Sequence, residues 1–195
     1  MLSSTTVSPQ SRDETLAALQ AVLSESELYW QSLPTDRFLA SIGEAWSPAE
    51  NVRHLTKSIR AVTVGLCLPR WLLAVRFGWA RSPSRSFDAL HAVYLERLAQ
   101  GASAGRFAPS ARQASPDPEG QRREIVSRHR VALNELHRAA EHWPERALDR
   151  RLLPHPALGK LTVREMLFFT LFHYRHHLVL VQGRLASLGV EAGTT

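Results

Sequence analysis

The chain has 195 residues, 44% of them hydrophobic, and a formal net charge of +6 at pH 7. This length and apolar content predict one domain with a sizeable core. The single cysteine, Cys67, excludes an internal disulfide bond and is typical of a reducing compartment. The positive charge is almost all arginine and is spread along the chain, which predicts a diffuse positive surface, so we do not expect a nucleic-acid partner.

The sequence also lacks the features of export and of membrane insertion. Its first residues, MLSSTTVSPQSRDE, contain no apolar segment of the kind that forms the core of a signal peptide. The apolar run 166–172 is far too short to span a membrane. We therefore expect a soluble, cytoplasmic protein with no membrane partner.

Helix starts are the clearest local signals in the chain. Capping boxes, in which a hydroxyl accepts from the amide three residues later and a glutamate reaches back, begin at Ser11, Ser47 and Thr162. Pro48 and Pro118 stand at first helical positions, where a missing N–H does no harm. Strand signals are weak throughout, so we predict an all-α fold. The helices are expected at about 12–32, 48–67, 87–100, 119–142 and 162–188.

Two connections in the middle of the chain are unlike the rest. Residues 101–120 are rich in Gly, Ala, Ser and Pro and predict a long crossover loop. Residues 67–86 are apolar and aromatic, which is typical of a short extra helix that packs on the bundle or contacts a second copy of the chain. In a third interpretation, Trp71, Phe77 or Trp79 covers a pocket. Four long helices with one extended connection indicate a helix bundle, a fold that builds its sites from side chains on facing helices.

The last predicted helix carries histidines inside an apolar run. At about 100° per residue, His173 and His177 lie about 40° apart and both fall within the apolar stripe. An i, i+4 pair of this kind can direct two ring nitrogens at one metal ion. His176 lies about 60° from His173 on the other side, so the pair His173/His176 ranks second as a metal pair. Without a metal, each buried imidazole would need another partner for both of its nitrogens.

A third histidine, His54, lies at a similar depth in the helix predicted at 48–67. The residues along its own line on that helix are small, namely Ser58, Ala61 and Gly65. They predict either a void beside the histidine or simply close packing of two helices, and the pattern alone leaves both interpretations open.

Other polar residues have simpler explanations. Glu50 lies on the same side as His54, but the capping box accounts for it without any role as a general base. Asn51 could orient a ligand, although a place on the surface is the better prediction. The remaining histidines form no convergent pattern and are expected on the surface or in loops: His91, His129, His137, His142 and His155.

Two segments together resemble the DinB/YfiT-like superfamily of metal-dependent enzymes. They are Trp46-Ser47-Pro48-Ala49-Glu50 followed by His54-Leu55, and HPALGKLTVREMLFFTLFHYRHH at 155–177. The resemblance implies a four-helix bundle with up-down-down-up connectivity and an insertion between the second and third core helices. The bundle domain would then span 11–188, between a disordered N-terminal tail, 1–10, and a C-terminal tail, 189–195. One departure is that Gln182-Gly183 matches only loosely the Gly-Gln-Ile that usually follows the last histidines.

The resemblance also implies a metal site made of His54, His173 and His177. Members of the superfamily include transferases of low-molecular-weight thiols and thiol-dependent isomerases, so it suggests a small-molecule substrate, such as a small thiol. Three neutral imidazoles leave a divalent ion with its full charge and with open positions, which is typical of catalytic sites. Zn, Ni, Mn and Fe all accept imidazole, and such an ion can activate water for hydrolysis or a thiol for transfer. The alternative is a non-catalytic bundle that binds a metal or a partner.

Overall fold

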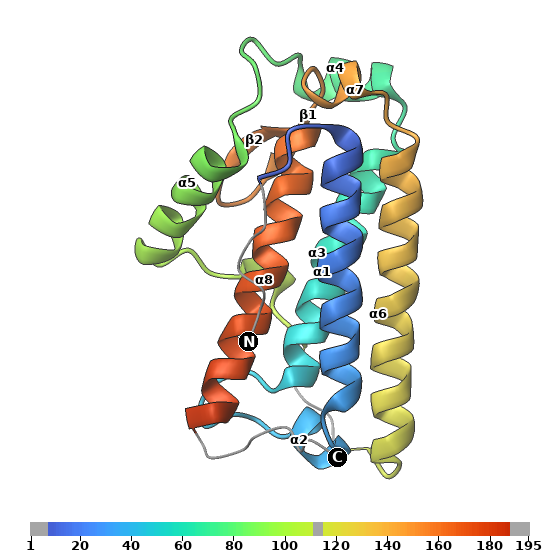
Figure 1. Cartoon of the computed structure of the whole chain (residues 1–195), viewed down its shortest axis with the longest axis vertical. Coiled ribbons are helices and arrows are strands. Elements are labelled where there is room, and N and C mark those ends of the chain that lie inside the picture. Colours follow the sequence, from blue (N-terminus) through green and yellow to red (C-terminus); the bar gives the residue numbers. More distant parts are fainter. Residues whose placement is uncertain (1–7, 111–114, 188–195) are drawn as a thin grey trace.

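The computed structural model of the chain describes residues 8–110 and 115–187 (Figure 1). The tails predicted at 1–10 and 189–195 lie outside these ranges except for residues 8–10. Four long helices stand side by side and account for most of the molecule: α1 (Arg12–Ser32), α3 (Pro48–Cys67), α6 (Pro118–Glu141) and α8 (Val163–Ser187).

The connectivity of these four helices agrees with the predicted bundle. In Figure 1, α1 and α8 run downward, whereas α3 and α6 both run upward. This is the up-down-down-up order, and it requires the chain to return along the bundle between α3 and α6. The predicted all-α bundle is therefore confirmed, and each long helix begins within one residue of its predicted start.

The capping boxes hold the helix starts as the sequence predicts. The side chain of Ser47 accepts from the amide of Glu50 at 3.1 Å, and the Glu50 carboxylate accepts from the amide of Ser47 at 2.8 Å. The same reciprocal pair occurs at Ser11 and at Thr162. These contacts satisfy amides that the first helical turn leaves without partners, and so they set where the helices with the histidines begin.

The core of the bundle is centred on α8, which is buried on every side over residues 163–174. It packs against α1, α3 and α5, and its buried side chains include Leu167, Phe168 and Tyr174. A helix with an apolar face all round is typical of the centre of a fold rather than its surface. The histidines near its middle are thereby taken out of water.

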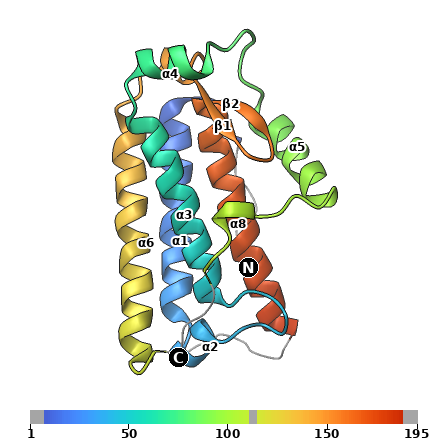
Figure 2. The ribbon, with the colours of Figure 1, turned by 180° about the vertical axis from the view of Figure 1, so that it is seen from behind.

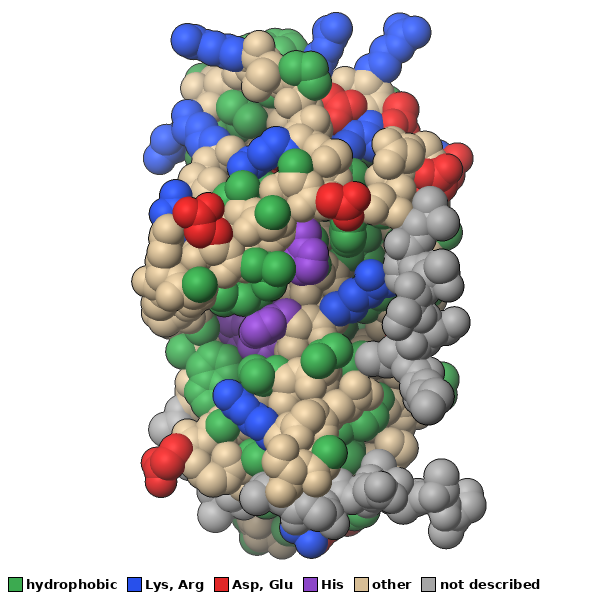
Figure 3. Space-filling model, turned by 60° about the vertical axis from the view of Figure 1, so that its left-hand side comes forward, with side chains coloured by type: hydrophobic (Ala, Val, Ile, Leu, Met, Phe, Trp, Pro, Cys, Tyr) green, Lys and Arg blue, Asp and Glu red, His purple; other side chains and the backbone are tan. Residues whose placement is uncertain are grey.

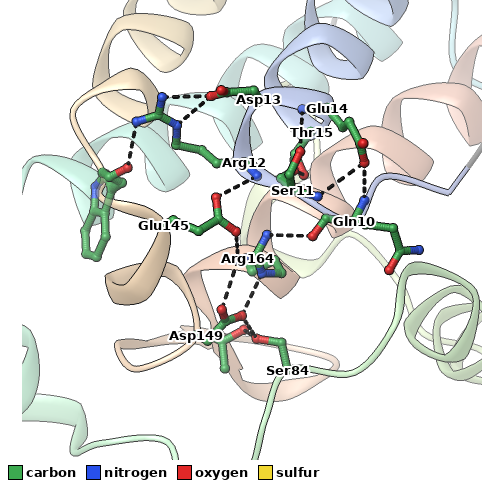
Figure 4. A network of polar contacts seen from close by, with 12 residues as sticks. Gln10, Ser11, Arg12, Asp13, Glu14, Thr15, Ser84, Glu145, Asp149 and Arg164 are labelled. Carbon is green, nitrogen blue, oxygen red and sulfur yellow. Dashed lines mark hydrogen bonds and ion pairs between the residues drawn. The ribbon is translucent and has the colours of Figure 1, made fainter.

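A buried arginine fixes the N-terminal end of α8 (Figure 4). Arg164 donates to Asp149 at 2.6 and 2.9 Å, to Glu145, and to the backbone oxygen of Gln10 at 3.4 Å. Glu145 in turn accepts from the first amide of α1, and Asp149 accepts from Ser84. The Arg164 hydrogen bonds hold the pKa of the Asp149 carboxyl below its usual range. One side chain therefore joins four separate segments at this end of the bundle.

The described part of the connection between α3 and α6 contains three short elements (Figure 2). They are α4 (Arg70–Phe77), α5 (Phe87–Ala99) and the 3-10 helix η1 (Gly105–Phe107). α4 confirms the extra helix expected within 67–86. α5 packs on α8 and η1 packs on α3, so the connection covers one side of the bundle between these two helices.

Three small elements were not expected from the sequence. Two are short helices, α2 (Thr35–Leu39) and α7 (Glu145–Leu148). The third is an antiparallel hairpin of β1 (Leu152–His155) and β2 (Gly159–Thr162), which the weak strand signals of the sequence did not indicate. Its turn contains none of the usual two-residue signals, and the reversal depends on Gly159, whose φ is +75°. The hairpin directly precedes α8.

Among the described residues, no single helix is both long enough and apolar enough to cross a membrane. α3 and α4 meet that test of length and composition only when they are joined, and the chain bends by 105° between them.

Candidate metal centre

Three histidines from two helices meet in the interior. His54 on α3 and His173 and His177 on α8 each offer one ring nitrogen, and these nitrogens all lie within 4.8 Å of one another. All three side chains are buried. The Nε2 atoms of His54 and His173 are 3.1 Å apart. The structure thus brings together the three residues that the sequence singled out, in a group that could hold a metal ion.

A backbone carbonyl orients the ring of His54. Nδ1 of His54 donates to the carbonyl oxygen of Phe107, in η1, at 2.9 Å. With the ring proton placed on Nδ1, the Nε2 atom presents its lone pair to the other two histidines. Burial lowers the pKa of His54, so this imidazole is neutral at pH 7.

Asn51 orients the ring of His177 in the same way. Nδ1 of His177 donates to Oδ1 of Asn51 at 2.7 Å, while the amide nitrogen of Asn51 donates to the carbonyls of Trp46 and Ser47. Those two carbonyls define which atom of the Asn51 amide is the oxygen. The prediction that Asn51 lies on the surface was wrong, since its exposed fraction is 1%. The alternative prediction, that Asn51 orients a ligand, agrees with this geometry.

The remaining ring, His173, is held by aromatic neighbours. It stacks on Phe169, with centroids 4.8 Å apart and planes 19° apart. Burial, followed by the charges of the neighbouring imidazoles, holds the pKa values of His173 and His177 well below their usual range. All three rings are therefore neutral at pH 7, the form in which imidazole binds a metal.

The donor set and one of its nitrogen–nitrogen distances fit a divalent ion. Two nitrogens about 2.1 Å from one ion are separated by about 3.0–3.4 Å when they subtend an angle between octahedral and tetrahedral values. The Nε2–Nε2 distance of 3.1 Å between His54 and His173 falls within that range. Outer hydrogen bonds such as those to Phe107 and Asn51 are typical of metal-binding histidines, because they fix the tautomer and raise ligand basicity.

Trp46 covers the histidines from the start of α3. Its ring is parallel to that of His177 within 5°, at 6.4 Å between centroids, and lies 5.3 Å from that of His54. The tryptophan of the sequence motif thus contacts the same group as the histidines that follow it, and it excludes water from one side of them.

The open side of the three histidines faces a cavity of about 400 Å³. Ser58, Ala61 and Gly65 line it, so the predicted void beside His54 is present. Close packing also occurs, because a Cβ on Gly65 would lie 2.9 Å from a methyl carbon of Leu153. Because Leu153 belongs to β1, Gly65 packs closely against the hairpin and not against a second helix.

The other walls of the cavity come from the connection and from the hairpin. Phe77 at the end of α4 lines the cavity, as one interpretation expected, whereas Trp71 and Trp79 do not. Residues 102–104 and the hairpin turn contribute further lining. On the face shown in Figure 3, histidine side chains come to the surface among hydrophobic ones near the middle of the molecule.

Three more rings with titratable groups line this cavity: Tyr94, His155 and His176. Nδ1 of His155 accepts from two backbone amides, so its proton is on Nε2, and burial lowers its pKa to about 4. Burial raises the pKa of Tyr94, which is therefore a hydrogen-bond donor at neutral pH. His176 lies next to the group of three but is not part of it, as its lower rank in the sequence predicts.

The surface or loop prediction for His129 and His155 was wrong. His155 was not expected in the cavity, although it begins one of the two recognised segments. His129 is buried in the core, where it contacts Tyr174 and Thr56. Its neighbours come from helices far apart in the chain, so no local pattern could identify it. Tyr94 carried no signal either, because it belongs to the connection rather than to the bundle. Glu50 caps α3, as expected.

No curated protein and no solved structure gives a significant match. The family model of the DinB superfamily matches residues 9–181. This span includes α1, α3, α6 and most of α8, together with both recognised segments and the three buried histidines of the metal group. The chain belongs to the DinB superfamily.

Proposed function

We propose that this protein is a metal-dependent enzyme that acts on a small molecule, with His54, His173 and His177 as the metal ligands. The observation that carries the proposal is the convergence of three buried, neutral imidazole nitrogens on one wall of a cavity of about 400 Å³. A cavity of that size is large enough for a small-molecule ligand. Membership of a metal-associated superfamily supports the same conclusion.

Residues around the three histidines would orient the metal ligands. The Phe107 carbonyl and Asn51 hold two of the ligand rings in the tautomer that presents a lone pair inward. Three protein ligands leave coordination positions open, and the cavity leads to them. A divalent ion bound there would lower the pKa of bound water or of a bound thiol toward neutrality.

Proton transfers at the site would fall to groups other than carboxylates. No Asp or Glu is among the cavity-lining residues of the described chain. His176, His155 and Tyr94 are ring side chains there that could accept or donate a proton to a reacting group. Transfer of a small thiol to an electrophile and hydrolysis are both compatible with this equipment, and thiol transfer is the reaction class we propose first.

The main alternative is a bundle that uses a metal for stability or for binding a partner. Structural zinc sites are almost always closed by four protein ligands. Here three ligands face a cavity, and this supports catalysis over a purely structural role. We further propose a cytoplasmic location, since the exposed thiol of Cys67 suits a reducing compartment. Zn, Ni, Mn and Fe all remain suitable metals for the site.

The test combines metal analysis with an activity screen. Untagged protein is analysed for bound metals, and then pairs of small thiols and electrophiles are screened with and without added Zn²⁺, Ni²⁺, Mn²⁺ and Fe²⁺. We expect one ion per chain and turnover that His173→Ala abolishes. Protein that binds no divalent ion would overturn the proposal. Metal binding without turnover of any thiol or ester substrate would favour the non-catalytic alternative.

A further inference from the structure

One cationic side chain stands alone at the cavity. Arg106 is the single Lys or Arg among the lining residues of the described chain, and no described Asp or Glu lines the cavity to neutralise it. The charge on this wall is therefore positive, and a divalent ion held by neutral imidazoles would add to it rather than cancel it.

The backbone that carries Arg106 is tied to the bundle. We call residues 102–110 the strap. Three side chains of α3 donate to backbone carbonyls of the strap. His54 Nδ1 donates to the carbonyl of Phe107 at 2.9 Å, Lys57 Nζ to that of Ala108 at 2.7 Å, and Arg53 to that of Ser110 at 2.6 Å. The strap is thus fixed to α3 at the residue next to Arg106 and at two of the positions that follow. One of the three donors is a proposed metal ligand, so the strap and the histidines keep a constant spacing.

The guanidinium of Arg106 is available to a ligand. It lies 5.2 Å from the centre of the Phe107 ring. It forms no hydrogen bond and no ion pair with a residue of the described chain. Lys57 and Arg53, by contrast, are engaged with carbonyls of the strap.

The remaining walls are mostly apolar. Between the strap and the bundle, the cavity is lined by Leu68, Phe77, Leu98, Leu153 and Phe169. A ligand that fills this volume would place a hydrocarbon or aromatic body against these side chains. Its two ends would then lie at the histidines and at Arg106.

We propose that Arg106 is an anion-binding residue, and that the cavity takes ligands with an apolar body and an anionic oxygen group such as a carboxylate. A guanidinium can bind both oxygens of a carboxylate with parallel N–H bonds, and it is weakly hydrated compared with an ammonium. The proposal rests on the proposed function, because the other end of the ligand meets the metal ligands.

The test uses three thiols of equal length and different charge: mercaptohexanoate, mercaptohexanol and aminohexanethiol. Binding to the cobalt(II)-loaded protein is followed by the absorption that a thiolate ligand produces. We expect the carboxylate to bind about fivefold to tenfold more tightly than the alcohol, and the amine to bind most weakly. Arg106→Gln should remove the preference, and Arg106→Lys should retain part of it.

Arg138→Gln is the matched control. Arg138 is an exposed arginine on α6, a helix that contributes no residue to the cavity. Arg138→Gln removes the same charge as Arg106→Gln but lies away from the cavity, so it should leave the preference for the carboxylate unchanged. An equal loss in Arg106→Gln and Arg138→Gln would show a general effect of net charge and would overturn the proposal.

A second measurement needs no metal. Hexanoate and hexanol are titrated into metal-free protein, and tryptophan fluorescence, to which Trp46 beside the site contributes, reports binding. A preference for hexanoate that disappears in Arg106→Gln supports the anion site even if the metal proposal fails. The anion site would be overturned if the metal-free protein bound hexanoate and hexanol equally and the cobalt protein bound the acid and alcohol thiols equally. That result would leave the metal proposal intact.

Discussion

The Nδ1 atom of His177 donates a hydrogen bond of 2.7 Å to Oδ1 of Asn51, and this contact joins α8 to α3. Asn51 is itself held by the carbonyls of Trp46 and Ser47, at the first turn of α3. The orientation of the imidazole is therefore set by the way in which a helix begins.

We expect Asn51→Ala to weaken metal binding by about 10-fold to 100-fold, because outer partners of ligand histidines have effects of that size. The imidazole would keep its place on α8 but lose the acceptor that fixes its tautomer. Competition with a chelator of known affinity measures the change. Asn134→Ala, at an exposed position on α6, is the control, and unchanged affinity in Asn51→Ala would show that the contact does not position a ligand.

Substitution of each histidine should separate ligands from neighbours. His54→Ala, His173→Ala and His177→Ala are expected to lose tight metal binding with little change in helix content, since the capping boxes and the core hold the helices. His176→Ala should retain the metal, because its ring lies outside the group of three. Metal titration beside circular dichroism tests the set. A loss of metal in His176→Ala but not in His177→Ala would contradict the proposed ligand set.

Buried His129 should make the protein sensitive to acid. Its Nδ1 is 2.8 Å from Thr56 Oγ1 and its Nε2 contacts Tyr174 Oη, and burial lowers its pKa to about 3. Above pH 6.5 both the folded and the unfolded protein hold this ring neutral. As the pH falls from 6.5 toward 3, only the unfolded state takes up the proton on this ring. His129 should therefore lower the free energy of unfolding by about 1.4 kcal/mol per pH unit, in addition to the effects of the other buried histidines.

His129→Gln isolates this contribution. Glutamine can replace both hydrogen bonds but does not titrate, so the variant should lose stability less steeply between pH 6 and 4, by about 1.4 kcal/mol per unit. Urea unfolding with a chelator present measures both proteins and avoids any effect of metal release. Parallel pH profiles for the two proteins would contradict the prediction.

Loss of Arg164 should destabilise the whole bundle. Arg164→Leu would leave Asp149 and Glu145 without their cation, and buried pairs broken in this way lose about 3–5 kcal/mol. Both acids are partly exposed, so we expect a smaller effect, about 2–3 kcal/mol. Arg146→Leu, at an exposed position on α7, should change stability by less than about 0.5 kcal/mol. Equal losses in thermal unfolding would show that the network contributes nothing specific.

The apolar segment around α4 bears on assembly. Leu73 is fully buried against the bundle, but Trp71 and Val75 stay 67% and 79% exposed on the same helix. We expect this surface to pair with a second copy, since two-fold dimers are the commonest assembly. Light scattering at micromolar concentration should give a dimer, and Val75→Glu should give a monomer. A monomeric parent protein would show that the exposed residues of α4 have another role.

The bundle and the histidine group could be predicted because their signals are local. A capping box marks where each of the two helices with the grouped histidines begins, and the 3.6-residue period then places His173 and His177 on one face. Asn51 could not be placed, because its burial depends on α8, more than a hundred residues later. The hairpin was missed because its strands are four residues each and its reversal depends on one glycine rather than on a recognisable turn pair.

The bundle and the connection contribute different residues to the site, and this has an evolutionary consequence. Both helices with the proposed ligands belong to the bundle, whereas Arg106, Tyr94 and Phe77 come from the connection between α3 and α6. The rings of His173 and His177 are held by residues of α3 and α8, and the ring of His54 depends on the connection through the Phe107 carbonyl. Descendants of such a protein can therefore diversify in what they recognise while they inherit the same three imidazoles, and ligand preference should vary between relatives more freely than the metal-binding residues do.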